Sequence, residues 1–386
     1  MAFLAQIGDL IGLFFLALCL CALVYTLVAA LVVPLYLGSP PRDPKAFPSV
    51  SMLKPLHGLE PGLEDNLKSF LNQDYPGPIQ IVFGVQDPAD PAIAMVNSLL
   101  AANPGLDANL VIDTDMHGGN RKVSNLINLE RRAKNDVVVL SDSDIRVDSR
   151  YLRNLVAELE QPGLGAITCL YVGRPVGGVW SKLAAMSINH HFLPNVVMGV
   201  TLGLAKPCFG STVALKKSVL DDIGGFRAVA DHLADDFVLG QLVREKGFKT
   251  KVSRWTISHM GSEPTAADLI AHEIRWARTI RVIEPAGFVG SGIAYALPFA
   301  AIACLLMPFQ ALPLWFLLAS LLSRVLLAWR VDQRTGCQAG ALWLVPVRDM
   351  LSFIVFVGAC FTNSVTWRGR RFKIHKSGTI YPVEDF

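Results

Sequence analysis

Two aspartates, Asp142 and Asp144, directly follow an apolar run at residues 137–140. Three valines and a leucine make up this run, which is typical of a fully buried strand. The spacing of two places both carboxylates on one face of an extended backbone. At the carboxyl edge of an α/β sheet they would lie where such sheets bind ligands. Their oxygens suit Mg²⁺ or Mn²⁺, and such an ion would bridge the pair to a diphosphate.

Two simpler interpretations of this pair stay open, since Asp-x-Asp also recurs in solvated turns and at helix N-caps. The metal interpretation therefore requires that the rest of the chain supplies a donor site, a base and an acceptor.

The composition indicates a membrane protein. Of the 386 residues, 52% are hydrophobic and 17% charged, and the mean hydropathy is +0.41. Ordinary soluble domains of this length are less apolar, so we expect membrane-spanning segments. The net charge of +3 does not indicate a nucleic-acid partner. The seven cysteines lack metal-binding spacing, which favours reduced thiols facing cytosol or lipid.

Residues 1–38 are predicted to form an N-terminal transmembrane anchor. Residues 7–37 carry one charge, Asp9, and about 20 apolar residues are enough to span a bilayer. The stretch lacks a preceding basic segment and an obvious cleavage site, which favours an anchor over a signal peptide. Arg42 and Lys45 follow in a proline-rich linker, 39–48, so the positive-inside rule predicts a cytoplasmic domain next.

Residues 285–362 are predicted to form a second membrane region, with spans at 288–309 and 311–328. The tail, 363–386, is rich in arginine and lysine and is therefore expected in the cytoplasm.

A third apolar stretch, 342–361, is interrupted by Arg348 and Asp349. Two spans would return the chain to the cytoplasm and three would not. We therefore predict that 342–361 is re-entrant or interfacial, with charges buried in protein. The alternative is a different count of spans elsewhere.

Residues 49–284 alternate between patterns typical of strands and of helices, which predicts an α/β fold. We expect a doubly wound, mainly parallel sheet with helices on both faces. Strands are predicted at 50–55, 79–85, 109–113, 137–140, 165–170 and 213–215. Helices are predicted at 63–72, 91–102, 120–134, 151–160, 219–223, 234–246 and 271–282.

Two further segments carry side chains that could take part in catalysis or acceptor binding but could also have purely structural roles. The apolar stretch 180–204 contains His190 and His191, and is either a core helix or an interfacial helix that meets a lipid. Asp235 and Asp236 open a predicted helix, where aspartate often serves only as a cap.

Five stretches together are specific enough to indicate a family. They are Lys54-Pro55-Leu56-His57-Gly58, Val85-Gln86-Asp87-Pro88-Ala89-Asp90-Pro91-Ala92-Ile93, Ser141-Asp142-Ser143-Asp144-Ile145-Arg146-Val147, Leu233-Ala234-Asp235-Asp236-Phe237 and Arg275-Trp276. In this order they resemble the ceramide glucosyltransferase family, membrane-anchored enzymes with a GT-A catalytic domain. The tail at 367–370 also looks like that family's tail motif. The resemblance covers residues 50–375 and implies an inverting transfer from a UDP-sugar, with 49–284 as the catalytic domain.

Three stretches are more similar to the bacterial hopanoid-biosynthesis branch of this family. They are Pro207-Cys208-Phe209-Gly210-Ser211, His232-Leu233-Ala234-Asp235-Asp236-Phe237 and His272-Glu273-Ile274-Arg275-Trp276-Ala277-Arg278-Thr279. That branch is understood to move N-acetylglucosamine from its UDP-sugar onto bacteriohopanetetrol. The resemblance thus implies this donor, a hopanoid acceptor and the bacterial inner membrane. A ceramide glucosyltransferase that uses UDP-glucose is the alternative.

Three positions depart from the family pattern. Glu60 stands where the family has its first aspartate, and Asp235 stands where the ceramide enzymes have glutamate. His272 replaces a glutamine or arginine. Processive polysaccharide synthases carry glutamine there, so His272 argues against a processive synthase, which would also need more spans.

The resemblance implies the main catalytic roles. Asp236, with Asp235 beside it, would take the proton from the acceptor hydroxyl, unless the pair is only a helix cap. Asp142 and Asp144 would hold Mg²⁺ or Mn²⁺ on the diphosphate of the leaving UDP. A non-catalytic membrane scaffold is disfavoured because all these carboxylates are present.

Donor-binding roles are expected for residues near the ends of predicted strands and on the predicted helix 120–134. Lys54 and Glu60 would contribute to the donor site, and Asp87 would contact the uridine unless it is a plain turn residue. Lys122 and Asn125 would reach the donor unless they lie on a solvated helix face.

The remaining expectations concern the membrane side. Arg275 would neutralise diphosphate charge and Trp276 would offer a wall to the sugar or acceptor, unless both simply anchor a helix at the membrane surface. His190, His191 and His272 are acceptor-side candidates. Arginines of the tail would fold over the diphosphate or attract anionic headgroups, namely Arg368, Arg370 and Arg371.

Overall fold

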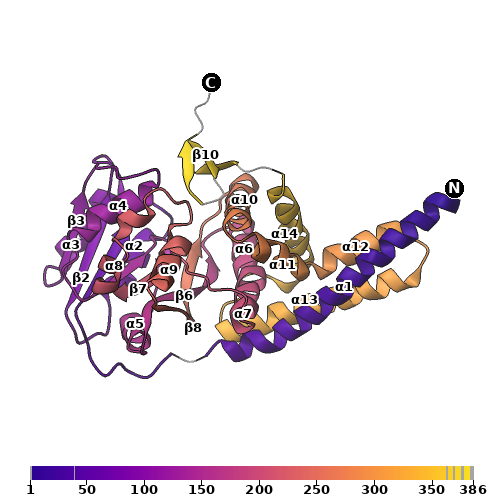
Figure 1. Ribbon diagram of the computed structural model, residues 1–386, viewed down its shortest axis with the longest axis horizontal. Helices are drawn as coiled ribbons and strands as arrows, with labels where there is room; N and C mark the ends of the chain where they lie inside the picture. The colour runs from indigo at the N-terminus through magenta and orange to yellow at the C-terminus, as the bar shows by residue number, and fades with distance from the viewer. Residues whose placement is uncertain (1, 39, 362–363, 368–369, 375–377, 383–386) are drawn as a thin grey trace. The chain divides into compact units, whose positions relative to one another are not determined.

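A computed structural model describes residues 2–38, 40–361, 364–367, 370–374 and 378–382 (Figure 1). The chain divides into two compact units. Unit 1 consists of Met1–Gly38, Val172–Ala205 and Glu263–Thr366, and unit 2 consists of Ser39–Tyr171, Lys206–Ser262 and Trp367–Phe386. Unit 2 therefore contains most of the predicted domain 49–284, without residues 172–205 and 263–284.

The first half of the main sheet is parallel. The sheet has eight strands in the order β3-β2-β1-β4-β7-β6-β8-β5. The parallel strands are β3 (Asp107–Ile112), β2 (Ile79–Val85), β1 (Val50–Pro55) and β4 (Val137–Ser141). Strands β1 and β4 are buried along their whole length, as expected when helices cover both faces. The predicted doubly wound α/β fold is confirmed in this half.

The second half of the sheet is antiparallel where its pairings are described, so the sheet as a whole is mixed. Its strands are β7 (Thr212–Lys216), β6 (Leu164–Pro175), β8 (Lys249–Gly261) and β5 (Ile145–Arg146). Strand β7 runs antiparallel to β4 and to β6, and β5 runs antiparallel to β8. Strands β5 and β8 were not predicted from the sequence.

Helices lie on both faces of the parallel half. The helices of unit 2 include α2 (Leu63–Leu71), α3 (Ala92–Ala102), α4 (Arg121–Glu130), α5 (Tyr151–Leu159), α8 (Lys217–Asp222) and α9 (Asp235–Glu245). Leu53 joins one apolar core with residues of α4, α8 and α9. Its neighbour Lys54 points to the opposite face, where Phe70 of α2 and Tyr151 of α5 contact each other with ring centroids 5.6 Å apart.

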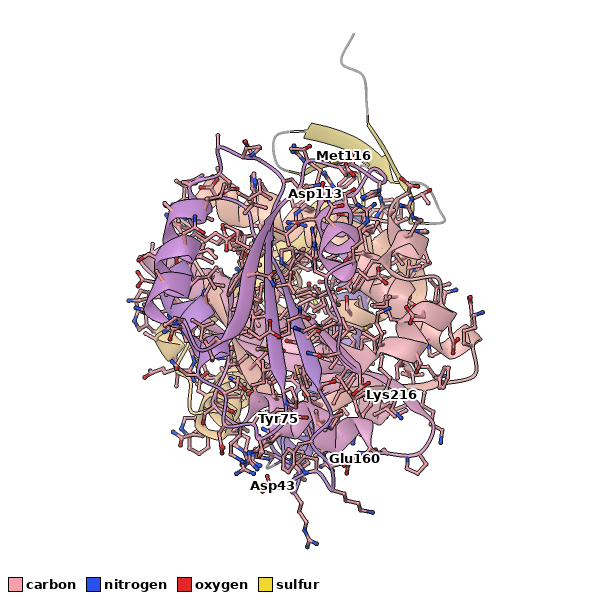
Figure 2. All side chains as sticks on the ribbon, turned by 90° about the vertical axis from the view of Figure 1, so that its left-hand side faces the viewer. Asp43, Tyr75, Asp113, Met116, Glu160 and Lys216 are labelled. Atoms are coloured by element: carbon pink, nitrogen blue, oxygen red, sulfur yellow. The ribbon has the colours of Figure 1, made fainter. Side chains whose placement is uncertain are left out.

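Figure 2 shows the two ends of this sheet. Asp113 and Met116, which follow β3, mark the carboxyl end of the parallel strands. Lys216, the last residue of antiparallel β7, pairs with Val137 at the start of β4 and marks the opposite end. Ligands of α/β sheets bind at the carboxyl end, so the site is sought on the side of Asp113.

Unit 1 contains a group of packed apolar helices. Helices α1 (Ala2–Tyr36), α12 (Ala296–Leu306) and α13 (Ala311–Thr335) run side by side (Figure 1). Cys19 of α1 contacts both neighbours, because its Sγ lies 3.4 Å from the Ala296 carbonyl oxygen and 3.2 Å from Ser320 Oγ.

Three helices of the described chain are long and apolar enough to cross a membrane. They cover Gln6–Tyr36, Ala311–Thr335 and Leu342–Ala359. A fourth candidate, Pro285–Ala294 with Ala296–Leu306, is bent by 65°. The stretch predicted to be re-entrant thus forms a 3-10 turn followed by helix α14 (Val345–Ala359), and the sharp break lies within residues 285–306, where a single span was predicted at 288–309.

The charges of α14 have buried partners inside unit 1. Arg348 donates two hydrogen bonds to Glu273, at 2.9 and 2.6 Å. Asp349 accepts from Arg324, with Nε–Oδ2 2.8 Å, and lies 2.8 Å from His191 Nε2. Paired charges are tolerated in an apolar segment, so these residues do not interrupt the helix.

The stretch predicted as one helix at 180–204 is three successive helices, α6 (Val179–Ser187), a π-helical turn (Ile188–Phe192) and α7 (Leu193–Thr201). Helix α10 (Ala266–Ile283) carries Arg275 and Trp276.

Candidate active site

Lys122 and Asp142 form an ion pair beyond the carboxyl end of β4. Lys122 lies in the first turn of α4, whose N-cap residue Asn120 accepts a hydrogen bond from the Val123 N–H. Lys122 Nζ lies 2.6 Å from Asp142 Oδ1 and 3.9 Å from Asp235 Oδ2. One largely buried ammonium group therefore faces carboxylates from two separate elements.

Asp235 and Asp236 begin α9 but have different surroundings. Asp235 is buried, and its Oδ1 accepts a hydrogen bond from Asn120 Nδ2 at 3.3 Å. Asp236 is partly exposed, and its two oxygens accept from the Gly210 N–H at 2.6 Å and the Phe237 N–H at 2.8 Å. Asp236 is thus held in one orientation while it stays accessible, as a base for an external hydroxyl must be.

Burial and neighbouring charges together shift the pKa values of Asp235, Asp236 and Lys122. Burial raises the pKa of Asp235 to about 7 and also raises the pKa of Asp236, and Lys122 opposes both shifts. Burial likewise works against the charge of Lys122, but Asp142, Asp235 and Asp236 together hold its pKa above the usual value. The lysine is therefore charged and keeps the carboxylates available as proton acceptors near neutral pH.

Lys54 binds the backbone of the Asp142–Asp144 turn. It is fully buried, and its Nζ donates a hydrogen bond to the Asp142 carbonyl oxygen at 2.5 Å. Burial lowers the pKa of Lys54 to about 7, although Asp142 and Asp144 oppose this shift. In this arrangement Lys54 fixes the backbone that presents Asp142.

Glu60 contacts the residue between the two aspartates. Its Oε2 accepts a hydrogen bond from Ser143 Oγ at 2.9 Å, and Asn66 Nδ2 donates to the Ser143 carbonyl oxygen at 3.2 Å. The longer side chain at position 60 therefore reaches the turn that carries Asp142 and Asp144.

Asp144 lies beside His259, a residue that the sequence analysis missed. His259 Nε2 is 3.1 Å from Asp144 Oδ2, in register with the pairing of Ile145 and His259 between β5 and β8. Burial works against the charge of Asp144, but His259, Lys54 and Lys122 hold the pKa of Asp144 at about 2. The alternation of apolar Trp255 and Ile257 with polar Thr256 and Ser258 was the strand signal available in the sequence.

The donor atoms here fit a divalent cation. Asp144 Oδ1 is buried without a hydrogen-bond partner among the described residues, as is expected of an oxygen that a cation would satisfy. The two carboxylates supply the oxygen ligands that Mg²⁺ and Mn²⁺ prefer. Within the described part of the chain, however, no three histidine, cysteine or acidic side chains already have metal-binding geometry.

The strand-end residues nearer β2 have structural contacts. Asp87 is exposed, and its Oδ1 accepts from the Ala89 N–H at 2.9 Å within a turn. Asn125 is buried and donates to the Gly84 carbonyl oxygen at 2.8 Å, so it does not lie on a solvated helix face, and its contact with the donor stays a prediction. Asp87 keeps an open side chain at the carboxyl end of β2, where uridine contact stays a prediction.

The other predicted residues belong to unit 1. His190 and His191 are buried, and their Nε2 atoms each lie 2.8 Å from a carboxylate oxygen, of Asp332 and Asp349 respectively. These ion pairs explain the burial of both histidines, and their contact with an acceptor stays a prediction.

His272 and Trp276 contact each other on α10, with ring centroids 4.4 Å apart, and His272 Nδ1 lies 2.6 Å from Glu263 Oε1. Arg275 lies on the same helix. Arg368 and the side chains of Arg370 and Arg371 fall outside the described residues.

Comparison with known proteins identifies relatives over nearly the whole chain. A model of glycosyl transferase family 21 matches residues 14–380. Ceramide glucosyltransferase 1 of Caenorhabditis elegans is 23% identical over 357 residues, covering 88% of this chain and 74% of the relative. An N-acetylglucosaminyltransferase of Rhizobium sp. is 25% identical over 243 residues, covering 60% of this chain and 53% of the relative.

One solved structure resembles the chain at the level of the fold. It is the mannosyltransferase PcManGT from Pyrobaculum calidifontis in complex with GDP-Man and Mn²⁺. The TM-score is 0.52 with 21% sequence identity, and the match covers 90% of this chain and 98% of that one. The similarity confirms the predicted glycosyltransferase fold.

Proposed function

Because the chain belongs to glycosyl transferase family 21, we propose that it transfers a sugar from a UDP-sugar to a hydroxyl group of a membrane lipid, with inversion. The observation that carries this proposal is the accessible carboxylate of Asp236, which lies close to the Lys122–Asp142 pair. A base and a diphosphate-binding group at one sheet edge are what direct displacement of UDP requires.

Asp236 is the proposed general base. Its carboxylate would accept the proton of the acceptor hydroxyl as the oxygen attacks the anomeric carbon. The backbone N–H groups of Gly210 and Phe237 keep it in one orientation, so little reorganisation is needed at the moment of transfer. Asp235 is the buried neighbour that shares the charge of Lys122.

Stabilisation of the leaving diphosphate is assigned to the other side of the cluster. A bound Mg²⁺ or Mn²⁺ would supply positive charge there, and Asp142 and Asp144 are the residues that would hold it, with His259 orienting Asp144. Lys122 would add a second positive charge. Lys54 and Glu60 act indirectly, since they hold the backbone and the turn that carry the two aspartates.

The finer assignment is UDP-N-acetylglucosamine as donor and bacteriohopanetetrol as acceptor. It rests on the motif resemblance in three stretches, residues 207–211, 232–237 and 272–279. UDP-glucose with ceramide is the second candidate, because relatives that match the chain over most of its length are named ceramide glucosyltransferases. Arg275, Trp276 and His272 of α10, with His190 and His191, are the proposed contacts to donor and lipid.

We place the catalytic unit at the cytoplasmic face of the bacterial inner membrane. In this topology α1 is the anchor, α13 and α14 are the two later spans, and the bent segment at 285–306 is re-entrant. Two later spans return the tail to the side of the membrane on which the rest of unit 2 lies. This agrees with the backbone hydrogen bond between Leu233 and Gly378, which requires both segments on one side.

The test is a transfer assay on the full chain purified in detergent. UDP-N-acetylglucosamine and UDP-glucose are each combined with bacteriohopanetetrol and with ceramide, and products are identified by mass spectrometry. We expect an N-acetylglucosaminyl hopanoid that is lost with EDTA. Glucosylceramide as the product would reject the hopanoid assignment and keep the mechanism.

Asp236→Asn is the matched catalytic variant, and Asp222→Asn, at an exposed aspartate of α8, is its control. Asp236→Asn should slow transfer by about 10²- to 10⁴-fold, and Asp222→Asn should leave its rate unchanged. Transfer to neither lipid by the wild-type chain would reject both acceptors.

A further inference from the structure

The C-terminal segment pairs through its backbone with the loop that leads into the catalytic helix. The Leu233 N–H donates a hydrogen bond to the Gly378 carbonyl oxygen at 3.1 Å. His232 and Thr379 form an antiparallel bridge next to it. Beyond Thr379 the chain continues as β11 (Ile380–Pro382), which pairs with β10 (Arg370–Ile374). All these residues belong to unit 2.

The loop at 230–234 is held on its other side by α4. Asn120 Nδ2 donates to the His232 carbonyl oxygen at 2.8 Å, and the Gly119 N–H donates to Asp231 Oδ1 at 2.8 Å. Asn120 also contacts Asp235 directly. The start of α4 therefore sets one border of this loop and Gly378 with Thr379 sets the other.

The first turn of α9 depends on these anchors. Its N-cap residue is Ala234, which offers no side-chain hydrogen bond to the helix. Leu233, the residue bonded to the tail, precedes Asp235 by two positions and Asp236 by three. A shift of this loop would move both carboxylates together, and a displacement of about 1 Å at a catalytic group can lower a rate about 100-fold.

We propose that residues 378–382 are a positioning element that holds the loop 230–234, and with it Asp235 and Asp236, in the geometry required for transfer. This inference rests on the proposed role of Asp236 as base. It assigns the tail a function through backbone pairing, separate from any attraction of its basic side chains for diphosphate or headgroups. The arginine and lysine residues of the tail all precede Gly378.

Truncation separates the two roles. Deletion of residues 378–386 from the full-length chain removes the pairing segment and keeps every basic residue. Deletion of residues 383–386 is the matched control, since it leaves 378–382 in place. Hydrogen exchange of the peptide containing Leu233 reports the contact, and kcat and KM for the UDP-sugar report its effect on transfer.

We expect the longer deletion to increase exchange at Leu233 and to lower kcat by about 10- to 100-fold, with KM for the donor changed less than about twofold. The shorter deletion should change neither. A tail that bound the diphosphate through this segment would instead raise KM. Unchanged exchange at Leu233, or increased exchange with unchanged kcat, would overturn the proposal.

A point-mutation pair covers the case in which the longer deletion does not fold. Gly378 has φ +80°, a conformation that asparagine tolerates and a β-branched residue does not. Gly378→Val should reproduce the loss of kcat and the increased exchange, and Gly378→Asn should retain both wild-type values. Equal behaviour of the two variants would contradict the inference. If the wild-type chain transfers to no lipid, the proposed function fails, while the exchange data still decide whether the tail holds the loop.

Discussion

Gly210 gives a prediction in which activity and stability separate. A β-carbon at this position would lie 2.8 Å from Lys122 Nζ, 3.4 Å from Asp236 Oδ2 and 3.5 Å from Asp142 Oδ2. Only the contact with Lys122 is too short. The far end of a lysine side chain can move at little cost, so we expect Gly210→Ala to fold normally and to displace the ammonium group.

The expected loss follows from the ion pair with Asp142. Moving Nζ to an ordinary contact distance requires about 0.6 Å, which would lengthen the 2.6 Å separation from Asp142 to about 3.2 Å. At an effective dielectric constant of about 20, the attraction then weakens by about 1 kcal/mol. A displacement of the same size away from the leaving diphosphate would weaken the stabilisation of its charge by a similar amount, so kcat/KM should fall by about five- to tenfold.

The assay compares kcat/KM and thermal unfolding of the wild type, Gly210→Ala and a control, Gly105→Ala. A β-carbon at Gly105 would have no other atom within 4 Å, and the φ of this residue is not positive, so the control should behave as the wild type. The reasoning is refuted if Gly210→Ala keeps full activity, or if its activity falls only together with its unfolding temperature.

Four further substitutions test the proposed base, the metal site, a buried aspartate and an ion pair of unit 1. Asp236→Asn should lower kcat by about 10² to 10⁴-fold and leave UDP-sugar binding by calorimetry unchanged; lost binding would argue against a base. Asp144→Ala should abolish Mn²⁺ binding measured by calorimetry, and retained binding would remove Asp144 from the metal site. The folded-state pKa of Asp235, about 7, lies above its unfolded value, so its protonation stabilises the fold at low pH and this contribution is lost as pH rises towards 7. Asp235→Asn should remove this fall in the free energy of unfolding between about pH 4 and 7. An unchanged pH dependence would exclude the raised pKa. Arg348→Ala should reduce the free energy of unfolding by about 3–5 kcal/mol because it leaves the Glu273 carboxylate, only 11% exposed, without its partner, and replacing both residues by leucine should recover most of the loss.

Local patterns in the sequence were sufficient to predict the parallel half of the sheet and the positions of the acidic residues at its edge. The buried strand β4 and the two aspartates after it follow from the period of two and from β-branched residues, which depend only on near neighbours along the chain. The same holds for Asp235 and Asp236 at the start of α9. The predicted strand at 79–85 coincides with β2 for the same reason.

Patterns of this kind could not predict the partners of charged residues. Arg348 and Asp349 interrupt an apolar stretch of the sequence, and only the structure shows that Glu273 and Arg324 are their partners. His259 was missed because its importance comes only from the pairing of β8 with β5.

The sequence by itself determined which elements form in the parallel half, the apolar segments and the carboxylates available for catalysis. Only the tertiary structure decided that Lys122 is shared between Asp142 and Asp235, that Gly210 fixes Asp236, and that the tail reaches Leu233. The reason is physical: strand and helix patterns arise from residues two to four apart, whereas charge balance and hydrogen-bond partners are set by segments that meet only when the whole chain has folded.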